Sequence, residues 1–297
     1  MQTFFPRILV TGYKGQLASA LHRHPLVRYF EFVACSHSML DISDEAALKK
    51  NLTQIKPQMI INAAAFTAVD RAEEHGFKAT QANVEGVRNL AHACKTHNIP
   101  MIHVSTDYVF DGNSVRPYTE DDPTAPLNYY GKTKRQGEEI VSEMLSNYIV
   151  LRVSGVFSEY GNNFLKKILE MAEANTQIRV VYDQVLCPTS AKDIAGVIYT
   201  LAKCYFFNKE KFKSGIYHYC SNSPITWFHF AMAALSEART YKDMMISLNP
   251  VSSEEYNALA KRPPYSVLDC SKILRDYGIE QPVWKPAMEQ VVKSFFV

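Results

Sequence analysis

The chain has 297 residues, enough for one large domain or two modest ones with a buried core. Hydrophobic residues make up 47% and charged residues 21%, which is typical of a globular protein and excludes a largely disordered chain. Lysine plus arginine (32) nearly balance aspartate plus glutamate (30), so the net charge of +2 favours neither nucleic acid nor an anionic membrane as a partner.

Short apolar runs alternate with helical patterns through the first half of the chain. Runs that are apolar throughout are typical of a parallel sheet covered by helices on both faces. We therefore expect an α/β fold with a Rossmann-type, doubly wound parallel sheet. The predicted strands span residues 7–11, 30–36, 59–62, 101–105, 149–153 and 216–220; the predicted helices span 16–24, 44–55 (capped by Asp44 or Ser43), 72–97 (one helix or two), 127–147, 163–174, 193–206, 226–238 and 286–296.

Beyond residue 155 the pattern loosens, and residues 178–189 are short, strand-like and rich in turns. We predict a sheet domain over residues 1–155 plus about 186–210, and a smaller C-terminal lobe over about 156–185 and 211–297. The six cysteines stand singly without a CxxC pair, which argues against a zinc site or a disulfide framework. The histidines show no metal-ligand spacing, so no metal site is predicted. The amino terminus lacks a signal-peptide pattern, no apolar run is long enough to span a membrane, and we expect a cytoplasmic protein.

A glycine turn follows the first predicted strand. Gly12 permits the tight turn, Gly15 lets a pyrophosphate approach the backbone, and Ala18 allows close packing of helix on strand. The amides that open the helix then face the phosphate charge. The pattern predicts a dinucleotide site; the alternative is a purely structural turn.

The residues after the second predicted strand bear on the choice of coenzyme. NAD enzymes place an acidic residue there, but this chain has Ser36-His37-Ser38. Lys14, in the glycine turn, is placed to face a 2′-phosphate. We therefore expect NADPH rather than NADH, with a solvated Lys14 as the alternative.

Tyr130 and Lys134 stand four residues apart, on one face of a predicted helix. A phenol is a poor acid or base near pH 7, and a nearby ammonium moves its pKa toward that range. Tyr129 points away around the same helix. The spacing predicts Tyr130 as a catalytic acid and Lys134 as the group that tunes it.

Ser105-Thr106-Asp107 closes the strand that begins at Met101. Ligands of open α/β sheets bind beyond the carboxyl ends of the strands. We expect the Thr106 hydroxyl to hydrogen-bond a substrate carbonyl and Asp107 to orient the substrate; the alternative for Asp107 is a turn-forming role.

These motifs together resemble the extended short-chain dehydrogenase/reductases, and within them the dTDP-4-dehydrorhamnose reductase family. The resemblance covers nearly the whole chain. It rests on the glycine turn, NAAA from Asn62, STDYVFDG from Ser105, APLNYYGKTK from Ala125, GNNF from Gly161 and RPPYSVLD from Arg262.

The resemblance implies NAD(P)H-dependent reduction of the 4-keto group of dTDP-4-dehydro-6-deoxy-L-mannose to dTDP-L-rhamnose, for surface polysaccharides such as lipopolysaccharide. It makes the first domain NAD(P)-binding and the second lobe nucleotide-sugar-binding, and is compatible with a homodimer. At the positions that match the family motifs, the resemblance implies that Tyr130, Lys134 and Thr106 are catalytic. It implies substrate contacts by Thr106, Asp107, Asn163 and Arg262. The implied cofactor contacts are Gly12, Gly15, Gln16, Leu17, Asp41, Ile42, Ala63, Ala64, Ala65, Tyr130 and Lys134. The alternative for Arg262 is a salt bridge.

Two positions depart from the family pattern. Gly155 stands where the family usually has a tryptophan that packs on the sugar, and Leu186 replaces a glycine. These departures leave open a related 4-keto sugar, of the dTDP-dihydrostreptose type. Trp227-Phe228 is expected to pack the second lobe.

Two further alternatives remain. A non-catalytic, NADP-binding regulatory subunit, resembling the methionine adenosyltransferase β-subunit, shares the YGKTK stretch and the RPPYSVLD tail. An epimerase or dehydratase is disfavoured, because Tyr108 follows Asp107 where a dehydratase places a second acid.

Overall fold

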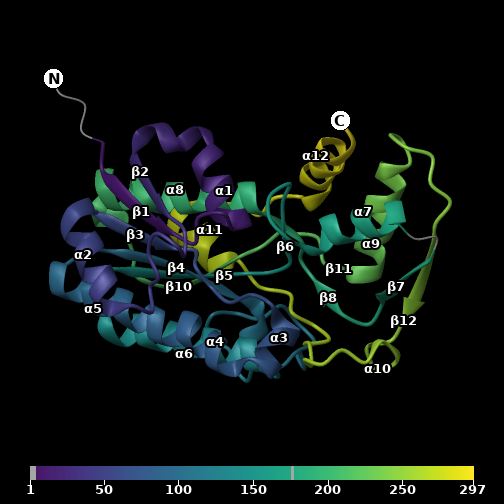
Figure 1. The fold of residues 1–297 in the computed structure, drawn as a ribbon, viewed down its shortest axis with the longest axis horizontal. Helices are drawn as coiled ribbons and strands as arrows, with labels where there is room; N and C mark the ends of the chain where they lie inside the picture. The colour runs from purple at the N-terminus through teal and green to yellow at the C-terminus, as the bar shows by residue number, and fades with distance from the viewer. Residues whose placement is uncertain (1–4, 175–176) are drawn as a thin grey trace.

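The computed structural model describes residues 5–174 and 177–297. Within these residues, six strands form one parallel sheet in the order β10-β5-β4-β3-β1-β2 (Figure 1). The strands are β1 (Arg7–Thr11), β2 (Glu31–Cys35), β3 (Met59–Asn62), β4 (Met101–Thr106), β5 (Tyr148–Val153) and β10 (Gly215–Tyr219). The predicted Rossmann-type fold is confirmed. β1 lies between β2 and β3, so the strands that follow β2 are added on the opposite side of β1. Doubly wound sheets bind ligands at such a switch point.

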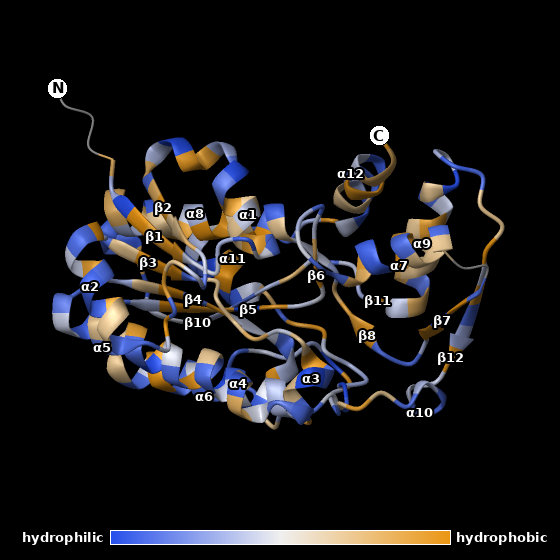
Figure 2. Cartoon of the chain, viewed as in Figure 1, coloured by the Kyte–Doolittle hydropathy of each residue, from blue (hydrophilic) through white to orange (hydrophobic). Residues whose placement is uncertain are grey.

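Helices cover both faces of the sheet (Figure 1). Successive strand residues point to opposite faces, so Ile8 and Val10 join one core while Leu9 joins the other. Figure 2 shows the apolar strands between two layers of amphipathic helices. One layer contains α1 (Gln16–Arg23), α8 (Ala191–Phe207) and α11 (Ser271–Tyr277); the other contains α2 (Glu45–Ile55), α5 (Gly86–His97) and α6 (Tyr129–Met144).

Side-chain caps fix where two helices begin. The Asp44 carboxylate accepts a hydrogen bond from the Ala47 amide at 2.9 Å, which confirms Asp44 as the cap of α2. Asn128 caps α6 by accepting from the Gly131 amide at 2.8 Å. Its amide also donates to the Lys261 carbonyl at 2.7 Å. The start of α6 is therefore tied to the C-terminal part of the chain.

The helical stretch predicted over residues 72–97 is interrupted. It comprises α3 (Val69–Glu74), α4 (Gly76–Thr80), a π-helical turn (Gln81–Glu85) and α5. The π-helical turn carries the buried Asn83, whose amide donates to Thr133 on α6 at 3.0 Å. The interruption thus brings a long-range contact that local periodicity does not encode.

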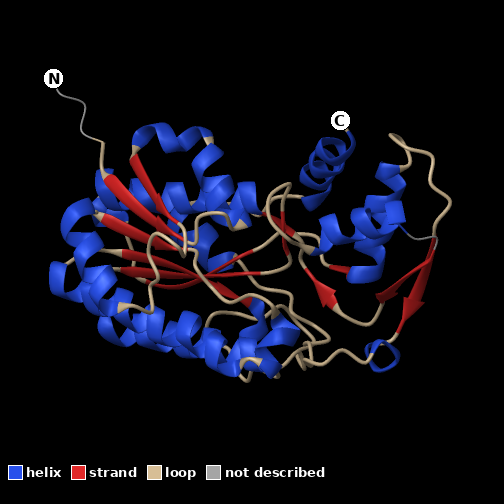
Figure 3. Ribbon diagram, viewed as in Figure 1, coloured by secondary structure: helices blue, strands red, loops and turns tan. Residues whose placement is uncertain are grey.

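The second lobe has its own hydrophobic core, built around residues such as Leu165, Ile178 and Phe230. Its helices and short strand pairs lie to one side of the sheet (Figure 3). The helices are α7 (Phe164–Ala174), α9 (Trp227–Ala238), α10 (Ser253–Tyr256) and α12 (Trp284–Phe296); the strand pairs are β6 (Val156–Phe157) with β9 (Thr189–Ser190), β7 (Gln177–Val181) with β12 (Ser247–Val251), and β8 (Val185–Leu186) with β11 (Ile225–Thr226). The sequence patterns did not predict β12, α10 or α11.

The boundary between the two parts differs from the predicted one. β10 was assigned to the second lobe with the rest of residues 211–297, but it pairs with β5 from Gly215↔Ile149 to Tyr219↔Val153, and α11 packs against it. The physical reason is burial: Tyr217 and Tyr219 extend the core of the sheet. No helix in the described part of the chain is long and apolar enough to cross a membrane.

Candidate active site

Two adjoining cavities lie at the carboxyl ends of the parallel strands. The larger has a volume of about 880 Å³ and the smaller about 300 Å³. The larger runs along the glycine turn after β1, and the smaller lies toward the second lobe. The residues that line both are Gln16, Thr67, Ser105, Tyr130, Val153 and Val156.

The glycine turn forms one wall of the larger cavity. Gly12 has a φ of +76°, and a Cβ built there would lie 2.7 Å from the Ala63 carbonyl oxygen, so both backbone conformation and space require glycine. Gly15 is the N-cap of α1 and leaves the amides of the first turn available for an anion. These features fit the pyrophosphate of a dinucleotide.

The NAAA segment faces the glycine turn. Thr11 donates to the Asn62 side-chain oxygen at 2.6 Å, and the Ala64 amide donates to the same oxygen at 3.2 Å. Asn62 is fully buried, so these bonds fix the course of the chain after β3. Every residue predicted to contact a cofactor lines the larger cavity: Gly12, Gly15, Gln16, Leu17, Asp41, Ile42, Ala63, Ala64, Ala65, Tyr130 and Lys134.

Basic side chains gather at the larger cavity. Lys14, His37 and Lys78 all line it, and Lys14 has a φ of +87°, a conformation that disfavours residues other than glycine. Asp41 lies 3.3 Å from the His37 ring and accepts a hydrogen bond from the Ser43 hydroxyl at 2.7 Å. Burial raises the pKa of Asp41, but the Ser43 hydrogen bonds and the His37 contact bring it below its usual value.

Tyr130 lies where the two cavities meet. Its ring packs edge-on against Tyr108, with the ring centres 6.0 Å apart. Burial raises the pKa of Tyr130, a hydrogen bond with Thr106 lowers it, and the charge of Asp107 raises it, for a net increase. The phenol is therefore protonated at neutral pH and can act as a proton donor.

Lys134 is one helical turn beyond Tyr130 and fully buried. Its ammonium donates to the Val104 carbonyl at 2.7 Å and lies 3.4 Å from the His103 ring. Burial lowers the pKa of Lys134 to about 8, against the opposing effect of Glu138. The Lys134 ammonium is therefore anchored on the backbone of β4, one helical turn from Tyr130.

Glu138 continues the same face of α6 and anchors the end of β4. It forms a buried ion pair with Arg152 at 2.7 Å, and the Ser105 hydroxyl donates to it at 2.5 Å. Ser105 immediately precedes Thr106. The position of the Thr106 hydroxyl therefore depends on a contact between α6, β4 and β5.

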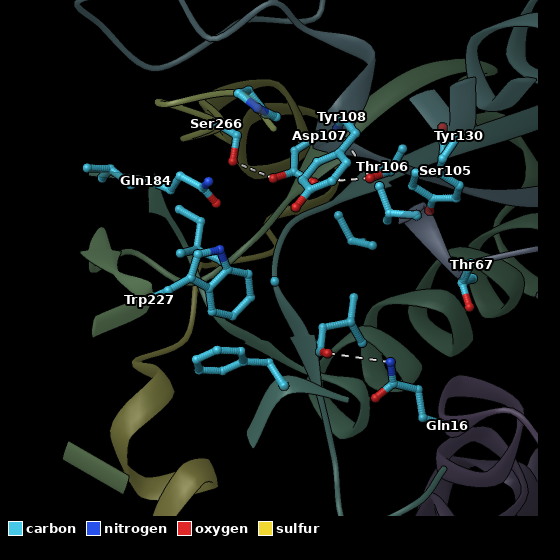
Figure 4. Close-up of a pocket in the computed structure, with 18 residues that line it drawn as sticks. Gln16, Thr67, Ser105, Thr106, Asp107, Tyr108, Tyr130, Gln184, Trp227 and Ser266 are labelled. Atoms are coloured by element: carbon cyan, nitrogen blue, oxygen red, sulfur yellow. Dashed lines mark hydrogen bonds between the residues drawn. The ribbon is translucent and has the colours of Figure 1, made fainter. Parts of the chain in front are cut away.

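Asp107 lines the smaller cavity, but its carboxylate is engaged by the protein. It accepts hydrogen bonds from Thr106 at 3.1 Å and Ser266 at 2.5 Å (Figure 4). It also accepts one from Ser154 at 2.8 Å. Burial raises the pKa of Asp107 to about 6, and these hydroxyls oppose the increase. Asp107 thus ties the ends of β4 and β5 to the C-terminal segment.

Asn163 and Arg262, the other predicted substrate contacts, lie outside both cavity linings within the described residues. The Asn163 amide donates to the Ser158 carbonyl at 2.8 Å, and its side-chain oxygen accepts from the Lys166 amide at 3.2 Å. Arg262 forms a bidentate ion pair with Asp70, at 3.0 and 2.7 Å. The structure therefore shows the salt bridge that the sequence left open for Arg262.

Gly155 and Leu186 both line the smaller cavity, and so does Trp227 (Figure 4). Sequence reasoning assigned Trp227 to packing alone; it does pack on Phe164, with ring centres 4.3 Å apart, and also faces the cavity. In the sequence, the feature that could have indicated this role is the position of Trp227 as the first residue of a helix capped by Thr226, at the end of the helix that faces the cavity. The pocket therefore has an indole, supplied by α9 rather than by the segment after β5.

Comparisons with known proteins agree on one family. A family model described as "RmlD substrate binding domain" matches residues 6–297. The chain is 39% identical over 288 residues to a dTDP-4-dehydrorhamnose reductase of Aggregatibacter actinomycetemcomitans, covering 96% of this chain and 98% of the relative. It is 36% identical over 288 residues to one from Sinorhizobium fredii, covering 96% of each. A crystal structure of dTDP-4-dehydrorhamnose reductase from Bacillus anthracis, in complex with NADP, matches with a TM-score of 0.87 and 32% identity over 99% of each chain.

Proposed function

This chain belongs to the RmlD substrate-binding-domain family, and from that premise we propose that it is an NADPH-dependent reductase of dTDP-L-rhamnose biosynthesis. It reduces the 4-keto group of dTDP-4-dehydro-6-deoxy-L-mannose to give dTDP-L-rhamnose. The relatives named dTDP-4-dehydrorhamnose reductase and the NADP-bound neighbour support this function. The observation that carries it is the place of Tyr130, a half-buried tyrosine at the junction of a dinucleotide-sized cavity and a smaller one.

We assign the larger cavity to NADPH and the smaller to the sugar. The glycine turn and the amides of α1 bind the pyrophosphate, and Lys14 faces the 2′-phosphate. When bound, NADPH supplies the hydride to the carbonyl carbon. Asp41, Ile42 and Ala63–Ala65 line the remaining length of the dinucleotide site.

Tyr130 donates the proton that completes the reduction. The alkoxide that forms at C4 is far more basic than a phenolate, so a protonated phenol transfers its proton downhill even though its pKa is raised. The Thr106 hydroxyl hydrogen-bonds the same oxygen and stabilises the developing charge. In the structure Thr106 donates its single proton to Asp107 at 3.1 Å, so when the carbonyl binds, this proton turns from Asp107 to the substrate oxygen.

Lys134 acts on the coenzyme side of Tyr130. It lines the larger cavity with its ammonium anchored on Val104. From there it binds the nicotinamide ribose and supplies positive charge near the phenol. We further propose that the protein acts in the cytoplasm on a dTDP-linked 4-keto-6-deoxy sugar and is able to form a homodimer.

The test is a coupled assay. The purified protein is mixed with dTDP-glucose, the upstream dehydratase, the 3,5-epimerase and NADPH, and absorbance of the reduced nicotinamide is followed. We expect oxidation that depends on every component and dTDP-L-rhamnose as product. A different reduced sugar would keep the chemistry and change the substrate to the dihydrostreptose type. Tight NADP binding without oxidation would instead support the regulatory-subunit alternative.

A further inference from the structure

Trp227 and Tyr130 face the smaller cavity from different parts of the fold. Tyr130 comes from α6, over the sheet, whereas Trp227 is the first residue of α9 in the second lobe. Figure 4 shows the two side chains on opposite sides of the cavity. Trp227 is partly exposed and lines the cavity.

The indole of Trp227 packs against two aromatic rings, while its N–H donates to no protein group among the described residues. Phe164 and Phe230 pack on it, with ring centres 4.3 and 6.5 Å away. Its N–H has no hydrogen-bond partner among the described residues, whereas the indole of Trp284 donates to the Ser223 carbonyl at 3.1 Å. A buried indole N–H usually finds a hydrogen-bond partner, whereas the indole of Trp227 is partly exposed and lines the cavity. Trp227 is therefore arranged to meet a ligand.

The lining of the smaller cavity contains both polar and apolar groups. Thr106, Asp107 and Ser266 supply hydroxyl and carboxylate groups, Gln16 and Gln184 supply amides, and Val156, Leu186 and Trp227 are apolar. A 6-deoxy hexose also has both kinds of group, since its hydroxyls form hydrogen bonds while its C–H face and methyl group do not. Such a ring fits with its C–H face or methyl group against the indole.

The size of the smaller cavity decides which part of the substrate enters it. At about 300 Å³ it is at the lower limit of ligand pockets, and a whole nucleotide sugar does not fit. The reacting carbon must reach Tyr130, so the sugar end occupies this cavity and the thymidine lies outside it. Trp227 therefore meets the sugar and not the base.

We propose that Trp227 is the sugar-selecting residue of this enzyme: its indole packs against the apolar face of the 6-deoxy hexose while Tyr130 and Thr106 hold the carbonyl. This inference rests on the proposed function. Leu186 closes the space beside Gly155, so the indole in the pocket comes from α9, next to Phe164 of α7.

The chain has two tryptophans, which makes a direct binding test available. Trp284→Phe leaves Trp227 as the sole indole, and Trp227→Phe leaves Trp284. With NADPH present throughout, so that dTDP-L-rhamnose cannot react, each variant is titrated with dTDP-L-rhamnose and with dTDP while emission is recorded. Calorimetry measures binding independently. We expect dTDP-L-rhamnose, but not dTDP, to change the emission of Trp284→Phe, and neither to change that of Trp227→Phe. If Trp284→Phe does not fold, the difference between wild type and Trp227→Phe gives the same signal.

An equal response of Trp227 to dTDP and dTDP-L-rhamnose would place the indole at the nucleotide and overturn the inference. Unchanged emission while calorimetry shows dTDP-L-rhamnose binding would also overturn it, and would leave the proposed function standing. No calorimetric binding of dTDP-L-rhamnose to the wild type would remove the proposed function itself, and this inference with it.

Steady-state kinetics provide the second readout. Trp227→Ala should raise KM for the nucleotide sugar by about tenfold or more, because a large apolar contact is lost, with kcat and KM for NADPH near wild type. Trp227→Phe should retain most of the affinity. Phe228→Leu is the control, since Phe228 does not line the cavity among the described residues. A fall in kcat with unchanged KM for the sugar, or equal effects of Trp227→Ala and Phe228→Leu, would contradict the proposal.

Discussion

Gly155 and Leu186 occupy adjoining space on the wall of the smaller cavity: a Cβ built on Gly155 would lie 2.5 Å from Leu186 Cδ1. The two residues are distant in the sequence and were noted there as separate departures from one family pattern. In the structure they form a single feature, because leucine fills room that only a glycine at position 155 leaves free. Gly155 also has a φ of +54°.

This contact predicts coupled stabilities. Gly155→Ala should destabilise the protein through the left-handed backbone, at about 1–2 kcal/mol, and also through the clash with Leu186. In a Leu186→Ala background the clash with Leu186 is removed, while the backbone part and the close approach to Pro188 Cα at 3.1 Å remain, giving a coupling of about 0.5–3 kcal/mol. Urea denaturation of the wild type, both single variants and the double variant measures it. Additive effects would mean that the two side chains do not compete for space.

Tyr130→Phe tests the proton donor. Activity in the coupled assay should fall by ~10²–10⁴, the usual range for a lost general acid, while the affinity for NADP⁺ stays near that of the wild type. Tyr129→Phe is the matched control, since the Tyr129 hydroxyl bonds to Thr80 at 2.9 Å and lines neither cavity among the described residues. Retained turnover in Tyr130→Phe would contradict the assignment of Tyr130 as the proton donor.

Lys14→Gly tests the choice of coenzyme. Glycine relieves the backbone strain of a φ of +87° and removes the side chain, so folding should not suffer. We expect kcat/KM for NADPH to fall by roughly tenfold, because a charge-assisted contact to the 2′-phosphate is lost, with NADH little affected. Parallel assays with the two coenzymes measure this. An equal change for both would show that Lys14 does not contact the 2′-phosphate.

Asp107 predicts a pH dependence of stability. Burial raises its folded-state pKa from an ordinary value near 3.8 to about 6, so in this window the folded state binds a proton that the unfolded state has lost. The contribution of Asp107 to the free energy of unfolding should fall by at most roughly 3 kcal/mol as pH rises from 3.8 to 6. The free energy of unfolding of the wild type and of Asp107→Asn is measured by denaturation at each pH in this range. The difference between the two values gives the contribution of Asp107. Parallel curves for the two proteins would contradict the prediction.

Glu138 and its neighbour Glu139 should differ sharply in their effect on stability. Glu138→Gln leaves Arg152 buried without its partner and should cost about 3–5 kcal/mol. Glu139 pairs with Arg135 at 2.8 Å on the exposed side of the same helix, so Glu139→Gln should cost no more than about 1 kcal/mol. The denaturant midpoints of the wild type and the two variants measure these losses of stability. Similar costs would show that the buried pair is not important for stability.

The sequence alone predicted the features that depend on short stretches of chain. Continuous apolar runs predicted a parallel sheet, since both faces of each strand are covered. The glycine turn and Asp44 followed from local backbone requirements. The spacing of Tyr130 and Lys134 placed both on one side of a helix, and both line the larger cavity.

Only the tertiary structure decided the features that depend on distant segments. The pairing of β10 with β5, the ion pair of Arg262 with Asp70 and the anchoring of Lys134 on Val104 each join parts of the chain far apart in sequence. Trp227 is the clearest case, because its place in the sequence fits a packing residue as well as it fits a residue that lines a cavity. Local propensity fixes which elements form, but the contacts that aim a side chain at a cavity arise only when separate elements pack together.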